Sequence, residues 1–293
     1  MMRVWNTVEA WRERRGEIGG RMVGFVPTMG ALHRGHAALV ERCRTENEIA
    51  VVSIFVNPTQ FNDARDLERY PRPLASDLAM LEALSVDDVL APGAADLYPS
   101  GYAFRIEAGE ITELMEGARR PGFLQGVMTV VLKLLNLVRP HRAYFGEKDY
   151  QQMQTIIRMV EDFFIPTEIV PCATVRAPSG LAESSRNRLL SEAGVERAAC
   201  LYRALTTAAS PADASATIEA EGLRVEYVEE HWGRRFVAAY LEGVRLIDNV
   251  PWGGPPGPQP APWPASGPRH ALDSATEERD EGVPRGPGGP PHN

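Results

Sequence analysis

Two histidines three positions apart, His33 and His36, are the first residues of this sequence whose types and spacing could carry out chemistry. They belong to Pro27–His36, where a predicted strand ends and a helix is expected to begin. The free N–H groups at a helix N-terminus bind phosphate, and an imidazole donates to a phosphoryl oxygen or, when protonated, offsets its charge. Gly35 would allow a ligand close to the backbone. The motif therefore fits adenylyl transfer, although a loop whose histidines only satisfy local hydrogen bonds fits it equally well.

A second group of polar residues, Phe145–Gln152, also follows a predicted strand. Gly146 would permit close approach of the backbone, and Lys148 supplies a point charge suited to a phosphate. Asp149 could accept a hydrogen bond from a ribose hydroxyl or help to hold Mg²⁺. Taken alone, this charged run fits a solvated turn better than a binding site.

Two more polar groups complete the set. Gly180–Asn187 contains two serines and an arginine that could surround a phosphate, or could cap a helix ahead of Leu189 and Leu190. Phe55–Phe61 ends the strongest predicted strand, and the amide of Gln60 within it both donates and accepts, which suits a hydroxy acid. Each group alone is a weak signal. Together, three groups at strand ends and one at the start of the next domain would converge on one crevice.

Alternating strand and helix signals surround these groups. Ile49–Val56 is the clearest strand, because its β-branched run lacks polar alternation and so indicates burial on both faces. The clearest helix is Gly126–Arg139, whose apolar residues recur at helical spacing. The other predicted elements are strands at 22–26 (ended by Pro27), 88–91, 143–145 and 167–170, and helices after Gly35 and at 77–84 and 150–163. This order predicts a doubly wound parallel α/β domain over residues 1–174, with ligands at the carboxyl ends of its strands.

The pattern changes in the last part of the chain. A helix near 195–209 precedes two short strands, 236–241 and 244–247, which could pair. These elements predict a small α+β domain over residues 175–250. The segment 251–293 is dense in Pro and Gly and has few apolar residues, which predicts a disordered tail.

Composition narrows the class of protein further. A net charge of -8 disfavours non-specific nucleic-acid binding, and no apolar run is long enough for a membrane span. The cysteines Cys43, Cys172 and Cys200 are scattered and odd in number. They argue against a disulfide framework or a zinc site and favour a reducing, cytoplasmic location.

Over Met1–Val250 the sequence resembles the pantothenate synthetase family, which belongs to the HxGH nucleotidyltransferase superfamily. The blocks that carry the resemblance are Pro27–His36, Asn57–Phe61, Tyr70–Arg72, Gly126-Val127 with Thr129–Val131, Phe145–Gln152, Ser184–Asn187 and Arg245–Asn249. It implies a Rossmann-like ATP-binding domain, a smaller lid domain, ATP as co-substrate, Mg²⁺ dependence and a homodimer. The implied reaction joins pantoate to AMP and releases pyrophosphate, and β-alanine then attacks the pantoyl adenylate.

The resemblance also implies roles for individual residues. His36 would be catalytic with the assistance of His33, and Lys148 and Arg186 would offset the charge of the reacting anions. Gln60 and Gln152 would hold pantoate, and Gln60 would also lie near β-alanine. The residues implied to contact ATP are Met29, Gly30, Ala31, Leu32, His33, Arg34, Gly35, His36, Gly146, Glu147, Lys148, Asp149, Val175, Glu183, Ser184, Ser185 and Arg186. No protein ligand to a metal is assigned.

The sequence departs from the family pattern at several positions. Phe123 stands where the family usually has His, and Ser179 where it usually has Asp. The stretch between Ser191 and Arg235 is shorter than the family's lid domain, which predicts a deletion near His231–Arg234, where a strand and loops would be expected. Glu183 replaces an apolar or small residue. Its carboxylate either faces the phosphates, which it would repel, or points to solvent, and the repulsion favours the solvent-facing orientation. Two alternatives therefore stay open: a weakly active or inactive ATP-binding homologue, and another HxGH nucleotidyltransferase. The amides of Gln60 and Gln152 favour a small hydroxy acid over the phosphorylated substrate that another HxGH nucleotidyltransferase would use.

Overall fold

The computed structural model describes residues 1–253 of the chain. In that range, no helix combines the length and the apolar character that a membrane span requires. The predicted disordered tail lies outside the described residues from residue 254 onward. Its first residue, Pro251, is the last residue of a strand.

Six parallel strands form the central sheet, in the order β1-β4-β3-β2-β5-β6. The strands are β1 (Arg3–Trp5), β2 (Val23–Thr28), β3 (Ile49–Ile54), β4 (Asp88–Leu90), β5 (Arg142–Gly146) and β6 (Glu168–Cys172). From β2 the chain forms β3 and β4 on one side and then returns to form β5 and β6 on the other side. The carboxyl ends of β2, β3 and β5 are therefore neighbours at the switch point of a doubly wound sheet. The predicted fold class is confirmed.

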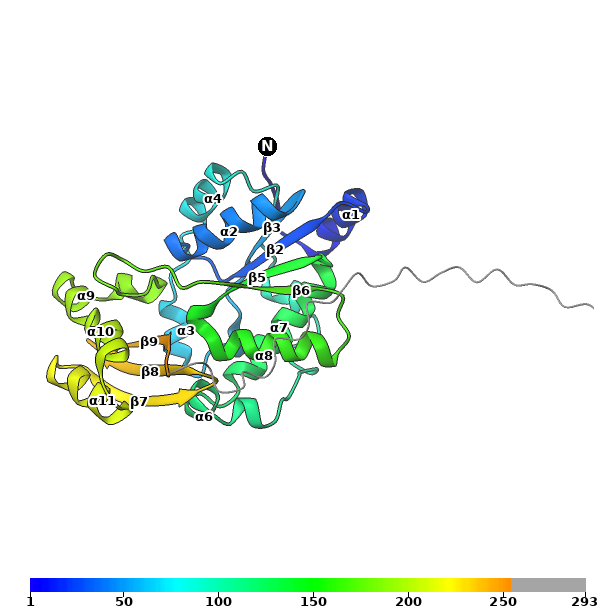
Figure 1. Ribbon diagram of the computed structural model, residues 1–293. Helices are drawn as coiled ribbons and strands as arrows, with labels where there is room; N and C mark the ends of the chain where they lie inside the picture. The colour runs from blue at the N-terminus through cyan, green and yellow to red at the C-terminus, as the bar shows by residue number, and fades with distance from the viewer. Residues whose placement is uncertain (254–293) are drawn as a thin grey trace, which may run out of the picture.

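Helices cover both faces of this sheet (Figure 1). One face carries α1 (Val8–Ile18), α7 (Phe123–Val138) and α8 (Tyr150–Asp162), and the other carries α2 (Arg34–Glu46) and α4 (Leu74–Ala83). Alternate residues of a strand serve the two faces, so Val51 of β3 packs with the first group and Val52 with the second. This explains why the sequence of β3 is apolar without alternation. Short helices in the connections are η1 (Pro58–Gln60), α3 (Ala64–Arg69), α5 (Ala94–Leu97), η2 (Glu110–Thr112), α6 (Met115–Arg119) and η3 (Glu147–Asp149).

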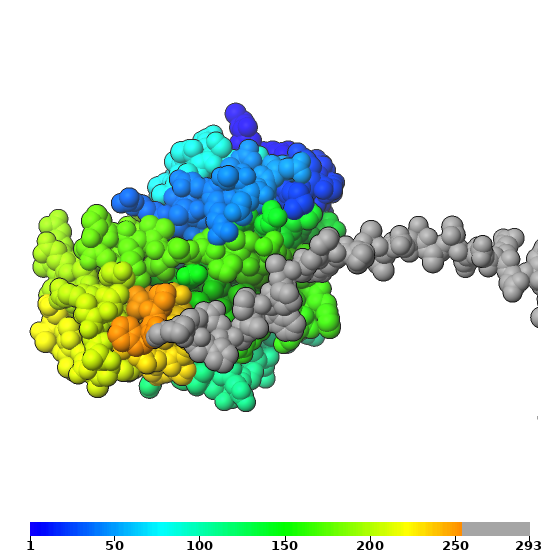
Figure 2. Space-filling model, in the orientation of Figure 1, coloured from blue at the N-terminus to red at the C-terminus, as the bar shows by residue number. Residues whose placement is uncertain are grey.

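A C-terminal module follows, and we use that name for η4 through β9. Its elements are η4 (Ser185–Leu189), α9 (Glu192–Ala198), α10 (Cys200–Thr207), α11 (Pro211–Ala220), β7 (Arg224–His231), β8 (Arg234–Leu241) and β9 (Val244–Pro251). The three strands form an antiparallel sheet, and apolar side chains of the helices pack against it in a core of their own. Figure 2 shows the yellow and orange residues of this module packed directly against green residues of the first module.

The structure corrects some of the sequence predictions about elements. Pro27 lies inside β2, which continues to Thr28; β2 pairs with β5 only at Gly24 and Phe25, so the proline removes no hydrogen bond from that side. The single helix predicted near 195–209 is two helices, α9 and α10. The strand β7 and the helix α11 were missed. At residues 231–234, where the sequence predicted a deletion, β7 and β8 form a hairpin.

Candidate active site

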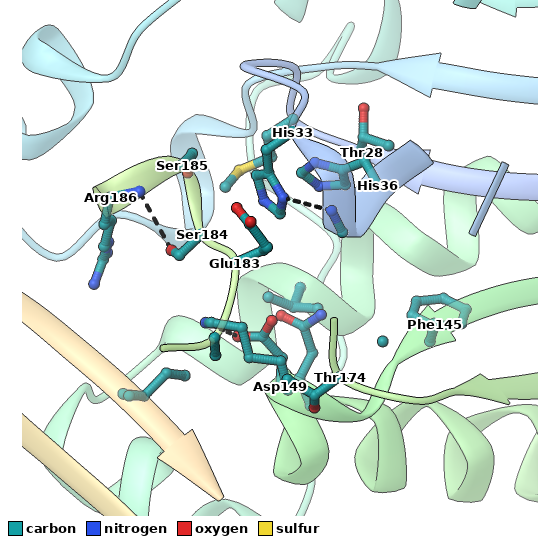
Figure 3. A pocket seen from close by; sticks show the side chains of 18 of the residues that line it. Thr28, His33, His36, Phe145, Asp149, Thr174, Glu183, Ser184, Ser185 and Arg186 are labelled. Atoms are coloured by element: carbon teal, nitrogen blue, oxygen red, sulfur yellow. Dashed lines mark hydrogen bonds and ion pairs between the residues drawn. The ribbon is translucent and has the colours of Figure 1, made fainter. Parts of the chain in front are cut away.

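A cavity of about 280 Å³ lies between the two modules. Thr28 at the end of β2, Gly146 at the end of β5 and Thr174 just beyond β6 line it from the side of the central sheet. The loop 183–187 and residues 245–248 of β9 line it from the side of the C-terminal module. Figure 3 shows the two histidines with the serine–arginine loop beside them. The cavity is therefore at the position where doubly wound sheets bind their ligands.

Most of the predicted site residues line this one cavity. They are Met29, His33, Gly35, His36, Gln60, Gly146, Lys148, Asp149, Gln152, Val175, Glu183, Ser184, Ser185 and Arg186. The four sequence groups therefore converge, as expected from their places at strand ends.

Five residues predicted to contact ATP do not line the cavity: Gly30, Ala31, Leu32, Arg34 and Glu147. The side chain of Arg34 is exposed. Glu147 lies 3.5 Å from a guanidinium of the C-terminal module. The backbone N–H groups of Ala31 and Leu32 each donate to a buried carboxylate at 2.8 Å.

That carboxylate belongs to Asp77 of α4, which is 2% exposed and was not singled out from the sequence. Its two oxygens hold the backbone of the motif loop, where Gly30 and Ala31 both have positive φ. Ala31 at φ 50 is sterically strained there, and the two hydrogen bonds offset this strain. Asp77 therefore shapes the loop that precedes the histidines.

His33 and His36 lie at the start of α2 with their ring centroids 4.1 Å apart. His33 is the N-cap residue, and its Nδ1 accepts a hydrogen bond from the Gly35 N–H at 3.1 Å. A Cβ at position 35 would lie 2.8 Å from the His33 ring, so glycine is required for this contact. Because Nδ1 accepts, the proton of neutral His33 is on Nε2. Within residues 1–253, the buried Nδ1 of His36 has no hydrogen-bond partner.

Both imidazoles are uncharged at neutral pH. Burial, followed by the charge of Lys148, lowers the pKa of His33 to about 4. Burial, followed by the neighbouring His33 and Lys148, lowers the pKa of His36 to about 3. The histidines therefore meet a ligand as hydrogen-bonding groups, and the positive charge at the cavity comes from lysine and arginine.

Lys148 and Asp149 form part of the η3 turn after β5. The Lys148 side chain is only 18% exposed, and its Nζ is 3.9 Å from the Asp149 carboxylate. The alternative of a fully solvated turn is therefore wrong for Lys148. The C-terminal module supports this turn through Asn249, whose Nδ2 donates to the carbonyls of Glu147 and Lys148, both at 2.9 Å.

The loop Ser184–Arg186 lies beside the histidines at the cavity (Figure 3). Ser184 caps η4, since its Oγ accepts from the Arg186 N–H at 3.2 Å, so the cap alternative is correct and does not exclude a place in the cavity. The Arg186 guanidinium donates to the Arg245 carbonyl at 3.1 Å and lies 3.6 Å from the Asp66 carboxylate. Arg186 thus contacts both modules.

Glu183 contradicts the sequence prediction. Figure 3 shows its carboxylate pointing into the cavity toward His33, not out to solvent. The backbone here is held in place, because the Glu183 N–H donates to the Val175 carbonyl at 2.9 Å and Ala182 bridges to Arg176. The cavity therefore contains a negative charge beside its histidines.

Gln60 is buried and oriented by a neighbouring amide. Its Oε1 accepts from Asn57 Nδ2 at 3.0 Å, and Asn57 is in turn held by the Tyr98 hydroxyl at 2.8 Å. Because the oxygen of Gln60 is taken, its NH₂ group is the part free to donate to a ligand. Asn57 and Tyr98 thus act as supports that the sequence motif alone did not reveal.

Sequence reasoning also missed an ionic network at one end of the cavity. The buried Glu116 carboxylate accepts two hydrogen bonds from Arg245, both at 2.7 Å, and one from the Tyr227 hydroxyl at 2.8 Å. Arg120 lies 3.6 Å from the same carboxylate and 3.6 Å over the ring of Phe123. In the sequence, this network was indicated only by Arg245, which belongs to the block 245–249 that carries the family resemblance. Phe123, which replaces the family's usual His, provides the ring on which Arg120 stacks.

The fold and the cavity define an α/β enzyme that binds an anionic ligand between a doubly wound sheet and a C-terminal module. The family model described as Pantoate-beta-alanine ligase matches residues 2–251. The chain is 50% identical to the pantothenate synthetase of Bdellovibrio bacteriovorus, over 83% of this chain and 95% of that relative. It is 46% identical to that of Coxiella burnetii, over 86% of this chain and 98% of the relative. The chain belongs to the pantoate–β-alanine ligase family.

Solved structures agree with this assignment. A pantoate–β-alanine ligase from Francisella tularensis, complexed with β-γ ATP and β-alanine, superposes with a TM-score of 0.82 at 42% identity and covers 85% of this chain and 97% of that one. The pantothenate synthetase from Thermus thermophilus gives a TM-score of 0.77 at 44% identity, over 85% and 99% of the two chains. Both of these structures are matched over almost their whole length.

Proposed function

We propose that this enzyme condenses pantoate with β-alanine at the cost of ATP, through a pantoyl adenylate, and releases AMP and pyrophosphate. The observation that carries the proposal is the convergence of His33, His36, Lys148 and Arg186 on one cavity that also contains the amide of Gln60. Adenylation brings a carboxylate up to an α-phosphate, so it requires fixed donors and cations in a poorly solvated space. No observation favours an inactive homologue or a different acceptor.

Each group has a role that follows from its chemistry. Lys148 and Arg186 supply positive charge to the phosphates, and both are held by neighbours that limit their movement. His36, with an unpartnered Nδ1 among the described residues, and His33 provide neutral hydrogen-bonding groups beside them. Gln60 donates through its NH₂ group to a hydroxy acid. Gln152, whose amide also lines the cavity, is assigned to pantoate as well.

The donor set fits Mg²⁺ that is bound mainly by ATP. In the part of the chain that the structure describes, no group of three or more acidic, histidine or cysteine side chains could hold a metal. Asp149 and Glu183 both line the cavity, and Mg²⁺ in nucleotide sites keeps several waters and uses one or two carboxylates with the phosphates. When bound, the ion would neutralise phosphate charge. The homodimer and the cytoplasmic location implied by the resemblance are part of the same proposal, and light scattering tests the first.

Isotope exchange between pyrophosphate and ATP tests the proposed reaction. We expect exchange that requires pantoate and does not require β-alanine, because adenylation precedes attack by the amine. Exchange that needs β-alanine would indicate a concerted reaction without a free adenylate. Absence of exchange would favour an inactive homologue, and exchange driven only by a phosphorylated acceptor would favour another nucleotidyltransferase.

A further inference from the structure

Asn249 connects the C-terminal module to the turn that carries Lys148. It lies on β9, and its side chain is 1% exposed. Its Nδ2 donates to the backbone carbonyls of Glu147 and Lys148, each at 2.9 Å. Both donors of one amide are therefore used on two consecutive carbonyls of the other module.

The orientation of this amide is fully determined by its partners. Asn249 Oδ1 accepts from Arg234 Nε at 2.6 Å, and Arg234 itself lies over the ring of Tyr150 and 3.5 Å from the Glu147 carboxylate. With two acceptors at one end and a guanidinium at the other, only an amide in this orientation satisfies all the contacts. A carboxylate at position 249 would face two carbonyl oxygens.

The turn that Asn249 holds has little support of its own. η3 spans only Glu147–Asp149, and no side chain caps its start at Gly146. Its central residue, Lys148, lines the cavity and lies close enough to both histidines for its charge to act on each of them. A shift of this backbone would therefore move the ammonium group away from the phosphates.

We propose that Asn249 is a positioning residue for Lys148, through which docking of the C-terminal module sets the place of the phosphate-binding cation. The proposal rests on the proposed function. Asn249 is not among the residues that line the cavity, so it acts through Lys148 and not on the substrates.

A double-mutant cycle tests this role. Asn249→Ala, Lys148→Ala and the double variant are compared in pantoate-dependent exchange at high enzyme concentration, so that slow variants stay measurable. We expect Asn249→Ala to lower the rate roughly 10- to 100-fold, the scale of a misplacement of about 1 Å. In the Lys148→Ala background the same change should cost less than about 3-fold, because the group that it positions is gone. Equal losses in both backgrounds, or no loss in the single variant, would overturn the proposal.

A matched control separates positioning from loss of stability. Asn47 is also buried, and its Nδ2 also makes two donations, to the Cys43 carbonyl at 2.8 Å and the Tyr144 hydroxyl at 2.7 Å, but it does not line the cavity. Asn47→Ala should lower the melting temperature by a similar amount and change the rate less than about 3-fold. If it slowed exchange as much as Asn249→Ala, general destabilisation would explain both. A wild-type enzyme without pantoate-dependent exchange would refute the proposed function instead, which keeps the two failures distinct.

Discussion

Removing the carboxylate of Glu116 should weaken the attachment of the C-terminal module. Glu116 comes from α6, is 7% exposed, and receives hydrogen bonds from Arg245 and Tyr227 of the other module. Glu116→Ala leaves Arg245 with Glu226 as its remaining carboxylate partner at 2.6 Å and leaves the tyrosine hydroxyl without its acceptor. Breaking a buried pair from one side costs about 3–5 kcal/mol. For a folded region of this size, that loss corresponds to a fall in melting temperature of about 6–20 °C.

Thermal unfolding followed by circular dichroism measures the effect, and an exposed ion pair provides the control. Arg142 and Glu168 form a contact of the same kind at 3.0 Å on the surface, so Glu168→Ala should lower the melting temperature by less than about 4 °C. If Glu116→Ala were no more harmful than Glu168→Ala, the network would not fasten the modules and the reasoning would be refuted.

The same network predicts a pH dependence with a definite sign. Burial alone would raise the pKa of Glu116, but the hydrogen bonds and charge of Arg245, with Tyr227 and Arg120, outweigh burial and leave the pKa below its ordinary value of 4.5. A carboxylate with a lowered pKa stabilises the fold above its unfolded pKa, and the stabilisation is lost as the pH falls through the folded value. The difference in stability between wild type and Glu116→Ala should therefore be full at pH 6 and shrink below about pH 4.5.

Three further predictions concern the cavity. His36→Ala should lower the turnover number by at least about 10²-fold in steady-state assays with little change in the KM for ATP, and unchanged turnover would remove His36 from the chemistry. In the folded protein the pKa values of His33 and His36 are lowered to about 4 and 3. As the pH falls below 6.5, these histidines therefore bind protons in the unfolded chain before they do so in the folded protein. Stability should thus decline from pH 6.5 to 4, and less steeply in His36→Asn, as melting curves at several pH values would reveal. Glu183→Leu should lower the KM for ATP by up to about 5-fold at low salt and less at high salt; a KM that is the same at both would show that the inward charge does not reach the phosphates.

The parts of the fold that the sequence predicted well have cores that can be recognised locally. β3 is an unbroken β-branched run because helices cover both of its faces, and α7 has apolar residues at helical spacing because it packs on the sheet. β7 was missed because three glutamates and a histidine interrupt its pattern, and its main inward contact is Tyr227, which packs with Met115 of the first module. α11 was missed because its buried residues are only Ala214 and Ile218. Short local patterns do not reveal such elements; their contacts across the molecule stabilise them.

The residues of the candidate site also divide into those that a local sequence pattern predicts and those that depend on distant contacts. The histidine motif and Lys148 are predictable because each is a compact group at a strand end. Asp77 and Glu116 are not, because their partners are distant in sequence: Asp77 binds the backbone of a loop 45 and 46 residues earlier, and Glu116 accepts from a tyrosine 111 residues later. The orientation of Glu183 was wrong because electrostatics was considered without the backbone contacts that hold this segment in place.

The alternation of β9 explains why one short block, Arg245–Asn249, serves two purposes. Residues 245, 247 and 249 share one face of the strand, and there Arg245 binds Glu116 of α6, Ile247 packs beside Met115, and Asn249 holds the η3 turn. Leu246 and Val250 point the other way, into the core that the C-terminal helices form. On this strand, Leu246 and Val250 thus pack within the module, whereas Arg245, Ile247 and Asn249 attach the module to the first module. Arg245 contacts Glu116, which lines the cavity, and Asn249 contacts the turn that carries Lys148, so a shift of β9 would strain both contacts. In this register residues 245–248 of the block line the cavity, and Asn249 holds the turn that carries Lys148.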